Sequence, residues 1–276
     1  MNILKWNESF SKDLQLKYNS AATRKNYASQ VSCFLNHFKS YSEPKSVPNS
    51  LIKDWLLEAK TINTRKHRLC ALNAFFKLTV GMPYKIQKIP YPKSDKKLPI
   101  VLSQDEVQAM FSVCENLKHK VILALLYSCG LRVSEIINLQ WSHLARSRKV
   151  INIVKGKGNK DRQVMFPDDL IALLETYWKE YHPKTYILNG QSKTQYTSRS
   201  VLEVVKQLSH KAGIKKRVYT HLMRHNTFTH MVENGTDINL IQKLAGHNSV
   251  KTTMMYVQIS DSLISKIASP ISQIKF

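Results

Sequence analysis

Side chains suited to phosphate chemistry gather in the C-terminal part of the chain. His221, Arg224 and His225 stand at positions i, i+3 and i+4, which would place all three on one face of a helix. His247 follows a glycine further along, and Tyr256 comes nine residues after it. A tyrosine delivered next to two histidines and an arginine suggests chemistry on a phosphate group.

The segment that carries His221 has helix end signals. Thr220 is a candidate N-cap and Gly235 a candidate C-terminal stop. The apolar residues Phe228, Met231 and Val232 would form its buried face. The sequence therefore predicts a helix that presents its polar face to a substrate.

The histidine pair also has the spacing of zinc ligands on a helix, since His225 follows His221 by four positions. The zinc-protease motif requires glutamate directly after the first histidine, and Leu222 occupies that position. The sequence favours phosphate chemistry over metal binding, and we expect neither a metal nor a cofactor.

The pattern His-x-x-Arg-His, then Gly-His, then Tyr resembles the tyrosine recombinase (phage integrase) family, Xer-like site-specific recombinases included. A further box fits this resemblance: an apolar run ends at Gly130, and Arg132 and Glu135 follow in Gly-Leu-Arg-x-x-Glu. Two positions depart conservatively from the family pattern, Met223 and Ala245, where leucine is commonest. A structural alternative for Arg132 is a simple ion pair with Glu135.

Cleaving a phosphodiester without a metal requires a nucleophile, charge stabilisation for a pentacoordinate phosphorane, and an acid for the leaving oxygen. The resemblance implies that Tyr256 attacks and forms a 3′-phosphotyrosyl link, and that Glu135 is a supporting acid. Planar guanidinium forks suit the non-bridging oxygens, histidines add hydrogen bonds, and His221 is a candidate to accept the tyrosine proton. The implied catalytic set is Arg132, Lys157, His221, Arg224, His247 and Tyr256.

Two β-rich runs, 150–154 and 163–166, flank a glycine-rich turn and predict a hairpin. A solvated turn is the plain interpretation of its lysines. The family resemblance implies that Lys157, between the two glycines, enters the active site and protonates the leaving 5′ oxygen. Lys155 and Lys160 are then candidate contacts to the DNA backbone.

The fold prediction is mixed α/β and mainly α. Apolar stripes predict a helical bundle over residues 1–92, which resembles the family's SAM-like core-binding domain. Residues 93–99 are rich in lysine and proline and predict a linker. Residues 100–276 would form the helical catalytic domain with a small antiparallel sheet and a tail helix from about 261 to 269.

Small polar and basic residues begin two helices of the predicted bundle. Such residues and helix N-termini contact phosphates, although a solvated helix face is an equal alternative. The candidate DNA contacts are Thr23, Arg24, Lys25, Arg65, Lys66 and Arg68.

The chain of 276 residues has 42 Lys and Arg against 19 Asp and Glu, a formal net charge of +23. Residues 1–95 hold 16 of the basic and 6 of the acidic residues, so the excess is spread along the chain. This balance indicates a polyanionic partner such as nucleic acid. Four scattered cysteines predict buried thiols in a reducing cytoplasm, and no apolar run predicts export or a membrane span.

These features predict a site-specific recombinase that cleaves and rejoins double-stranded DNA at core sites. The resemblance implies a homotetramer on DNA, with a monomer or weak self-association off DNA, and a tail that docks on a neighbouring protomer rather than on its own core. The alternatives are a DNA-binding protein that lost the chemistry, and a type IB topoisomerase that relaxes DNA. The sequence names neither the target site nor whether the outcome is integration, excision, inversion or resolution.

Overall fold

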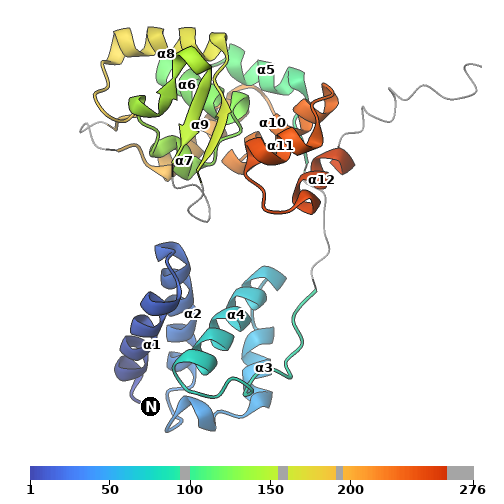
Figure 1. The fold of residues 1–276 in the computed structure, drawn as a ribbon. Coiled ribbons are helices and arrows are strands. Elements are labelled where there is room, and N and C mark those ends of the chain that lie inside the picture. The colour runs from blue at the N-terminus through green and yellow to red at the C-terminus, as the bar shows by residue number, and fades with distance from the viewer. Residues whose placement is uncertain (94–99, 155–160, 191–194, 260–276) are drawn as a thin grey trace, which may run out of the picture. The chain divides into compact units, whose positions relative to one another are not determined.

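The computed structural model describes residues 1–93, 100–154, 161–190 and 195–259. The chain divides into two compact units, Met1–Lys96 and Lys97–Phe276 (Figure 1). We call them the N-terminal and C-terminal units and describe each by itself. Their boundary falls within the segment predicted as a linker.

The N-terminal unit contains four α-helices and a short 3₁₀ turn in its described part. Helix α2 packs against both α1 and α4. Ser20 and Thr61 cap α2 and α4 by accepting hydrogen bonds from backbone amides three residues ahead, at 3.3 and 3.1 Å. The helices are α1 (Ile3–Lys17), α2 (Ala21–His37), α3 (Asn49–Leu57) and α4 (Ile62–Leu78). Their shared core is rich in aromatic rings, among them Phe10, Phe34, Trp55, Phe75 and Phe76.

The C-terminal unit opens with α5 (Gln104–Ser112), whose N-terminus has a capping box between Ser103 and Glu106. Helix α6 (Leu117–Ser128) is the buried apolar helix and packs against α8 and α10. The remaining helices are α7 (Val133–Ile137), α8 (Asp168–Tyr181), α9 (Ser198–Lys211), α10 (Thr220–Glu233), α11 (Ile238–Ala245) and α12 (Val250–Ile259).

A small antiparallel sheet lies in this unit, in the order β1-β2-β3. Strands β2 (Val150–Ile153) and β3 (Arg162–Met165) pair as the sequence predicted, with Ile151 opposite Val164. The two-residue strand β1 (Leu144–Ala145) was not predicted. The predicted class, mainly helical with a small antiparallel sheet, is confirmed.

Helix α10 is more deeply buried than its sequence pattern predicted. We expected only an apolar face to be covered, yet every residue from Leu222 to His230 is buried. Helices α6, α9, α11 and α12 all contact it. The polar residues on this helix therefore lie inside the unit.

The cysteine prediction is wrong for half of the cysteines. Cys114 and Cys129 are buried, whereas Cys33 is exposed and Cys70 partly exposed, because they occupy the outward sides of α2 and α4. Among the residues that the structure describes, no helix is long and apolar enough to cross a bilayer.

Candidate active site

Arg132 is held at the start of α7 by its own helix. Gly130 takes a left-handed conformation with φ of 57°, which turns the chain between α6 and α7. Arg132 then occupies the N-cap position, where its backbone N–H donates to Glu135 Oε2 at 2.8 Å and its Nη1 donates to Oε1 at 2.8 Å. The ion pair weighed as a structural alternative is therefore real, and 19% of the Arg132 side chain stays exposed.

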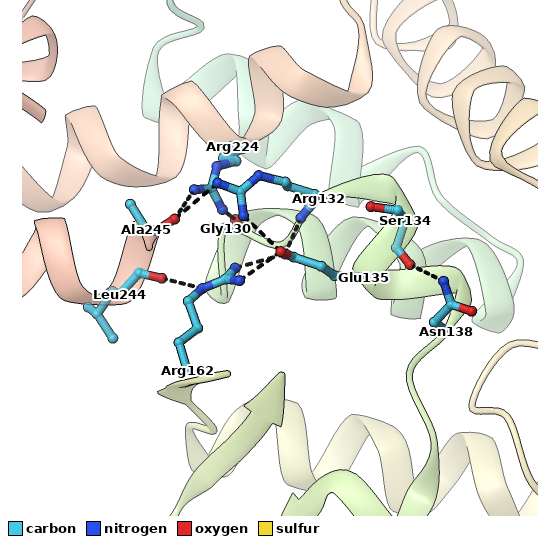
Figure 2. A network of polar contacts seen from close by, with 9 residues as sticks. All are labelled: Gly130, Arg132, Ser134, Glu135, Asn138, Arg162, Arg224, Leu244 and Ala245. Carbon is cyan, nitrogen blue, oxygen red and sulfur yellow. Dashed lines mark hydrogen bonds and ion pairs between the residues drawn. The ribbon is translucent and has the colours of Figure 1, made fainter. Parts of the chain in front are cut away.

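Glu135 binds a second arginine more completely than the first. Arg162 Nη1 and Nη2 donate to Oε1 and Oε2, each at 2.7 Å, and Arg162 Nε donates to the Leu244 carbonyl at 2.9 Å (Figure 2). Burial alone would raise the pKa of the Glu135 carboxyl, but Arg162 and then Arg132 lower it to about 2. Glu135 is therefore a buried, ionised carboxylate at neutral pH.

Arg224 lies at the centre of the arginine cluster and is 1% exposed. Its Nη1 donates to the Gly130 carbonyl and its Nη2 to the Ala245 carbonyl, which also accepts from Arg132 Nη2 at 3.3 Å (Figure 2). Burial, aided by the charge of Arg132, lowers the pKa of Arg224 to about 10, so it keeps its charge at neutral pH. Backbone carbonyls at the C-terminal end of α11 thus hold all three arginines.

His221 and His225 of α10 differ in exposure although they share a face. His221 is exposed in the first turn, and the His225 ring lies 4.6 Å from its ring and 5.7 Å from that of Tyr256. Burial, with the nearby His221 and Arg224, lowers the pKa of His225 to about 4. Thr220, expected as the N-cap, is instead the first helical residue, and Tyr219 takes the cap position.

His247 is presented by the turn after α11. Gly246 ends this helix in a left-handed conformation, φ 62°, and His247 Nδ1 lies 3.1 Å from Thr253 Oγ1 of α12. The His247 ring stacks on Tyr256 with centroids 5.9 Å apart and 20° between the planes. Burial, then Arg224 and Arg132, lowers the pKa of His247 to about 4.

Tyr256 lies on α12 with only 1% of its surface exposed. Its ring contacts those of His225, Phe228 and His247. Burial raises the pKa of the phenol above 10, although a hydrogen bond and charge from Arg224 act against that shift. The phenol is therefore protonated at neutral pH and needs a base before it can attack.

The structure brings five of the six predicted catalytic residues into one region of the C-terminal unit. These are Arg132, His221, Arg224, His247 and Tyr256. Lys157, with Lys155 and Lys160, lies outside the described residues. In the hydrogen-bonded cluster of described residues, three guanidiniums surround the Glu135 carboxylate, and this excess of positive charge suits a dianionic phosphorane.

The sequence did not predict Arg162 as part of this cluster. Strand alternation could have found it, because Arg162 lies two positions before the buried Val164 and so shares the inward face of β3. An arginine on the apolar face of a strand requires a buried acid, and Glu135 is that acid.

The candidate DNA contacts of the N-terminal unit lie on neighbouring helices, since Asn26 on α2 is 3.2 Å from His67 on α4. Arg24 donates to the Tyr18 carbonyl at 2.9 Å, and the Arg68 guanidinium stacks 4.2 Å from the Trp55 ring. Lys25 is exposed, while Thr23, Arg65 and Lys66 are partly exposed. Arg24 and Arg68 thus also hold the fold.

Residues 101–262 match the model of the Phage integrase family. A putative integrase/recombinase y4qK of Sinorhizobium fredii is 32% identical, covering 95% of this chain and 87% of the relative. The tyrosine recombinase XerA of Pyrococcus horikoshii is 32% identical, covering 92% and 88%. The crystal structure of XerH recombinase in a post-cleavage complex with its difH substrate has the same fold, with a TM-score of 0.72, 20% identity and coverage of 91% and 80%. The chain belongs to the phage integrase family of tyrosine recombinases.

Proposed function

We propose that Tyr256, Arg132, Arg224, His221, His247 and Lys157 carry out the strand cleavage of this tyrosine site-specific recombinase. The observation that supports these roles best is the position of Tyr256, whose phenol lies beside the buried Arg224 and against His247. No other tyrosine of the C-terminal unit has such surroundings among the residues that the structure describes. The relative XerH, solved in a cleavage complex, supports double-stranded DNA as the substrate.

In the proposed reaction the Tyr256 oxygen attacks the scissile phosphorus. The new phosphorus–oxygen bond replaces the bond to the 5′ oxygen, which leaves with a proton from Lys157 as a free hydroxyl. Arg132 and Arg224 bind the non-bridging oxygens, and a histidine, His221 in the simplest scheme, takes the phenol proton. The 3′-phosphotyrosyl bond keeps the energy of the broken bond, so a 5′ hydroxyl of another strand can reverse the steps.

Tyr256→Phe should abolish the covalent protein–DNA adduct and leave DNA binding almost unchanged, because only the phenolic oxygen is lost. A nicked suicide substrate traps the wild-type adduct on a denaturing gel, and a mobility-shift titration measures binding. Tyr219→Phe, in the same unit but at the cap of α10, is the matched control and should form the adduct. An adduct formed by the Tyr256→Phe protein would refute the assignment.

Lys157→Ala should slow cleavage of the natural 5′ oxygen far more than cleavage of a 5′-bridging phosphorothiolate. Sulfur is a better leaving group and hardly needs an acid. Single-turnover rates on both substrates distinguish a role of Lys157 as the acid from a role in DNA binding. Lys155→Ala is the control. Equal slowing by Lys157→Ala on both substrates would make Lys157 a binding residue.

We further propose that the N-terminal unit contacts DNA through α2 and α4, that the protein acts in the cytoplasm, and that four protomers assemble on two core sites. The positive charge in both units supports a shared DNA partner. A tetramer would supply four nucleophiles, one for each of the four strands of two recombining duplexes.

A further inference from the structure

Arg162 cannot bind a DNA phosphate through two parallel hydrogen bonds, because the protein already binds its paired donors. Its side chain is 8% exposed, its two terminal nitrogens are bound to Glu135, and its Nε is bound to the Leu244 carbonyl. The protein itself therefore occupies the Nη1–Nη2 edge of the guanidinium and its Nε (Figure 2). Its effect on a substrate has to pass through the residues that it binds.

We propose that Arg162 is a positioning residue for strand cleavage, which neutralises Glu135 so that the charge of Arg132 remains available to the scissile phosphate. The inference rests on the proposed function of Arg132 and Tyr256. It assigns a role to a buried ion pair outside the proposed catalytic set.

The charges of the cluster support this role. Glu135 has one negative charge and accepts from two guanidiniums, and the paired contacts at 2.7 Å come from Arg162. Without Arg162, the carboxylate would keep Arg132 as its one guanidinium partner among the described residues, and that pair would be neutral overall. The phosphorane formed from a phosphodiester has two negative charges, so losing one positive charge beside it raises the barrier.

The contacts of Arg162 also join three parts of the site. Arg162 is the first residue of β3, five residues after Lys157 in the chain. Through Glu135 it fixes the N-cap of α7, and its Cδ packs so closely against Gly246 that a Cβ added there would lie 2.9 Å away. The Arg162 side chain therefore links three parts of the site: the strand that follows Lys157, the helix that begins after Arg132, and the turn that presents His247.

A change of charge on the substrate tests this proposal. Single-turnover cleavage is measured at saturating DNA with a natural scissile phosphate and with a neutral methylphosphonate in its place. Arg162→Gln should slow the natural substrate about 10- to 100-fold, the range found for residues that orient metal ligands in other active sites. The loss should shrink strongly on the methylphosphonate, because its transition state has one negative charge fewer. Arg132→Gln should show the same pattern.

The matched control is Arg146→Gln. Arg146 also pairs with a glutamate, Glu175, but on the exposed surface, and this variant should cleave both substrates at the wild-type rate. If Arg162→Gln does not fold by circular dichroism, Arg162→Lys is measured instead. It keeps the positive charge without the bidentate contact to Glu135, so its loss on the natural substrate should be clearly smaller than that of Arg132→Gln. A loss as large as that of Arg132→Gln would overturn the inference.

Equal slowing of both substrates by Arg162→Gln would show that Arg162 is a structural residue only, and this would overturn the inference. A wild-type rate of Arg162→Gln on the natural substrate would also overturn it. Either result, with a normal Tyr256-dependent adduct in the wild-type protein, leaves the proposed function intact. A wild-type protein without that adduct would overturn both.

Discussion

His225 and His247 are neutral in the folded protein at neutral pH, because burial and the surrounding positive charge lower the pKa of each to about 4. Neutral imidazoles add no further positive charge to the arginine cluster. They can also accept hydrogen bonds or protons, which an imidazolium cannot. The site therefore combines permanently charged guanidiniums with histidines that stay free to exchange protons.

This neutrality predicts a pH dependence of stability. Each histidine binds a proton near pH 6.5 when unfolded but only near pH 4 when folded, so the unfolded state binds more protons in this window. The free energy of unfolding should be fully retained above about pH 6.5 and fall towards pH 4, by up to about 3 kcal/mol per histidine. Urea denaturation across this range measures the loss.

The double variant His225→Gln/His247→Gln should flatten that pH dependence, because glutamine takes up no proton. His210→Gln on the exposed side of α9 is the matched control and should leave the slope as in the parent. A slope unchanged in the double variant would assign the loss to other groups.

At the scale of residues, the sequence predicted which residue types gather and offered the ion pair of Arg132 with Glu135, but it did not predict the other pairings. The common site of Arg224, His247 and Tyr256 was predicted from the resemblance to the family, because these residues lie on α10, after α11 and on α12, and helix geometry within one element does not bring them together. The bidentate pair between Arg162 and Glu135 spans 27 positions, and no local pattern encodes it. The neutral state of His225 likewise depends on neighbours that only the folded chain supplies.

The turn between α11 and α12 connects the arginine cluster with the tyrosine helix. Gly246 has a positive φ and lies against Arg162, so Gly246→Ala adds both backbone strain and a clash. We expect a loss of about 2–4 kcal/mol in unfolding free energy, from roughly 1–2 for strain and a similar cost for crowding. Cleavage should slow as well, because the turn also presents His247.

Gly213→Ala is the matched control for that variant. Gly213 has a similar φ of 69°, yet nothing lies within 4 Å of the added carbon. It should cost only the strain, about 1–2 kcal/mol, and leave cleavage unchanged. Thermal melts measure the stability loss of both variants, and single-turnover rates measure their cleavage. Equal stability losses would show that the contact with Arg162 is unimportant.

Element types were predictable where local signals are strong, as for the pair of strands β2 and β3. The burial of α10 was not, because its polar residues find partners far away in the chain. Asn226 accepts from the Leu102 amide at 3.1 Å, and Thr227 donates to the Tyr127 carbonyl at 2.7 Å. Hydrogen bonds of this kind let polar side chains occupy a helix face that patterning assigns to solvent.

At the scale of the whole molecule, each unit has its own apolar core and its own excess of positive charge. Both features could be anticipated from length and composition. How four such molecules meet on DNA depends on surfaces between copies, which apolar periodicity within one chain does not encode. The predicted tail helix, outside the described residues, is our proposed link between copies.

Deleting residues 262–276 should leave a protein that binds a half-site but builds few synapses and recombines little. Leu263, Ile264 and Ile267 would form one apolar helix face, which suits a groove on a partner protomer. A native gel resolves half-site complexes from synapses, and a plasmid assay measures recombination. A protein lacking only residues 271–276 is the control. Normal synapses from the larger deletion would favour docking on the tail's own protomer.

The burial of Tyr256 affects how often the protein would cleave DNA away from its target site. Because Tyr256 is 1% exposed, its phenol has to become accessible before it can reach a duplex. If exposing the phenol costs about 4 kcal/mol, roughly one protomer in a thousand has an accessible nucleophile at any moment. A genome offers roughly 10⁶–10⁹ competing sites. The low fraction of accessible nucleophile reduces cleavage at all of them equally, independently of sequence recognition.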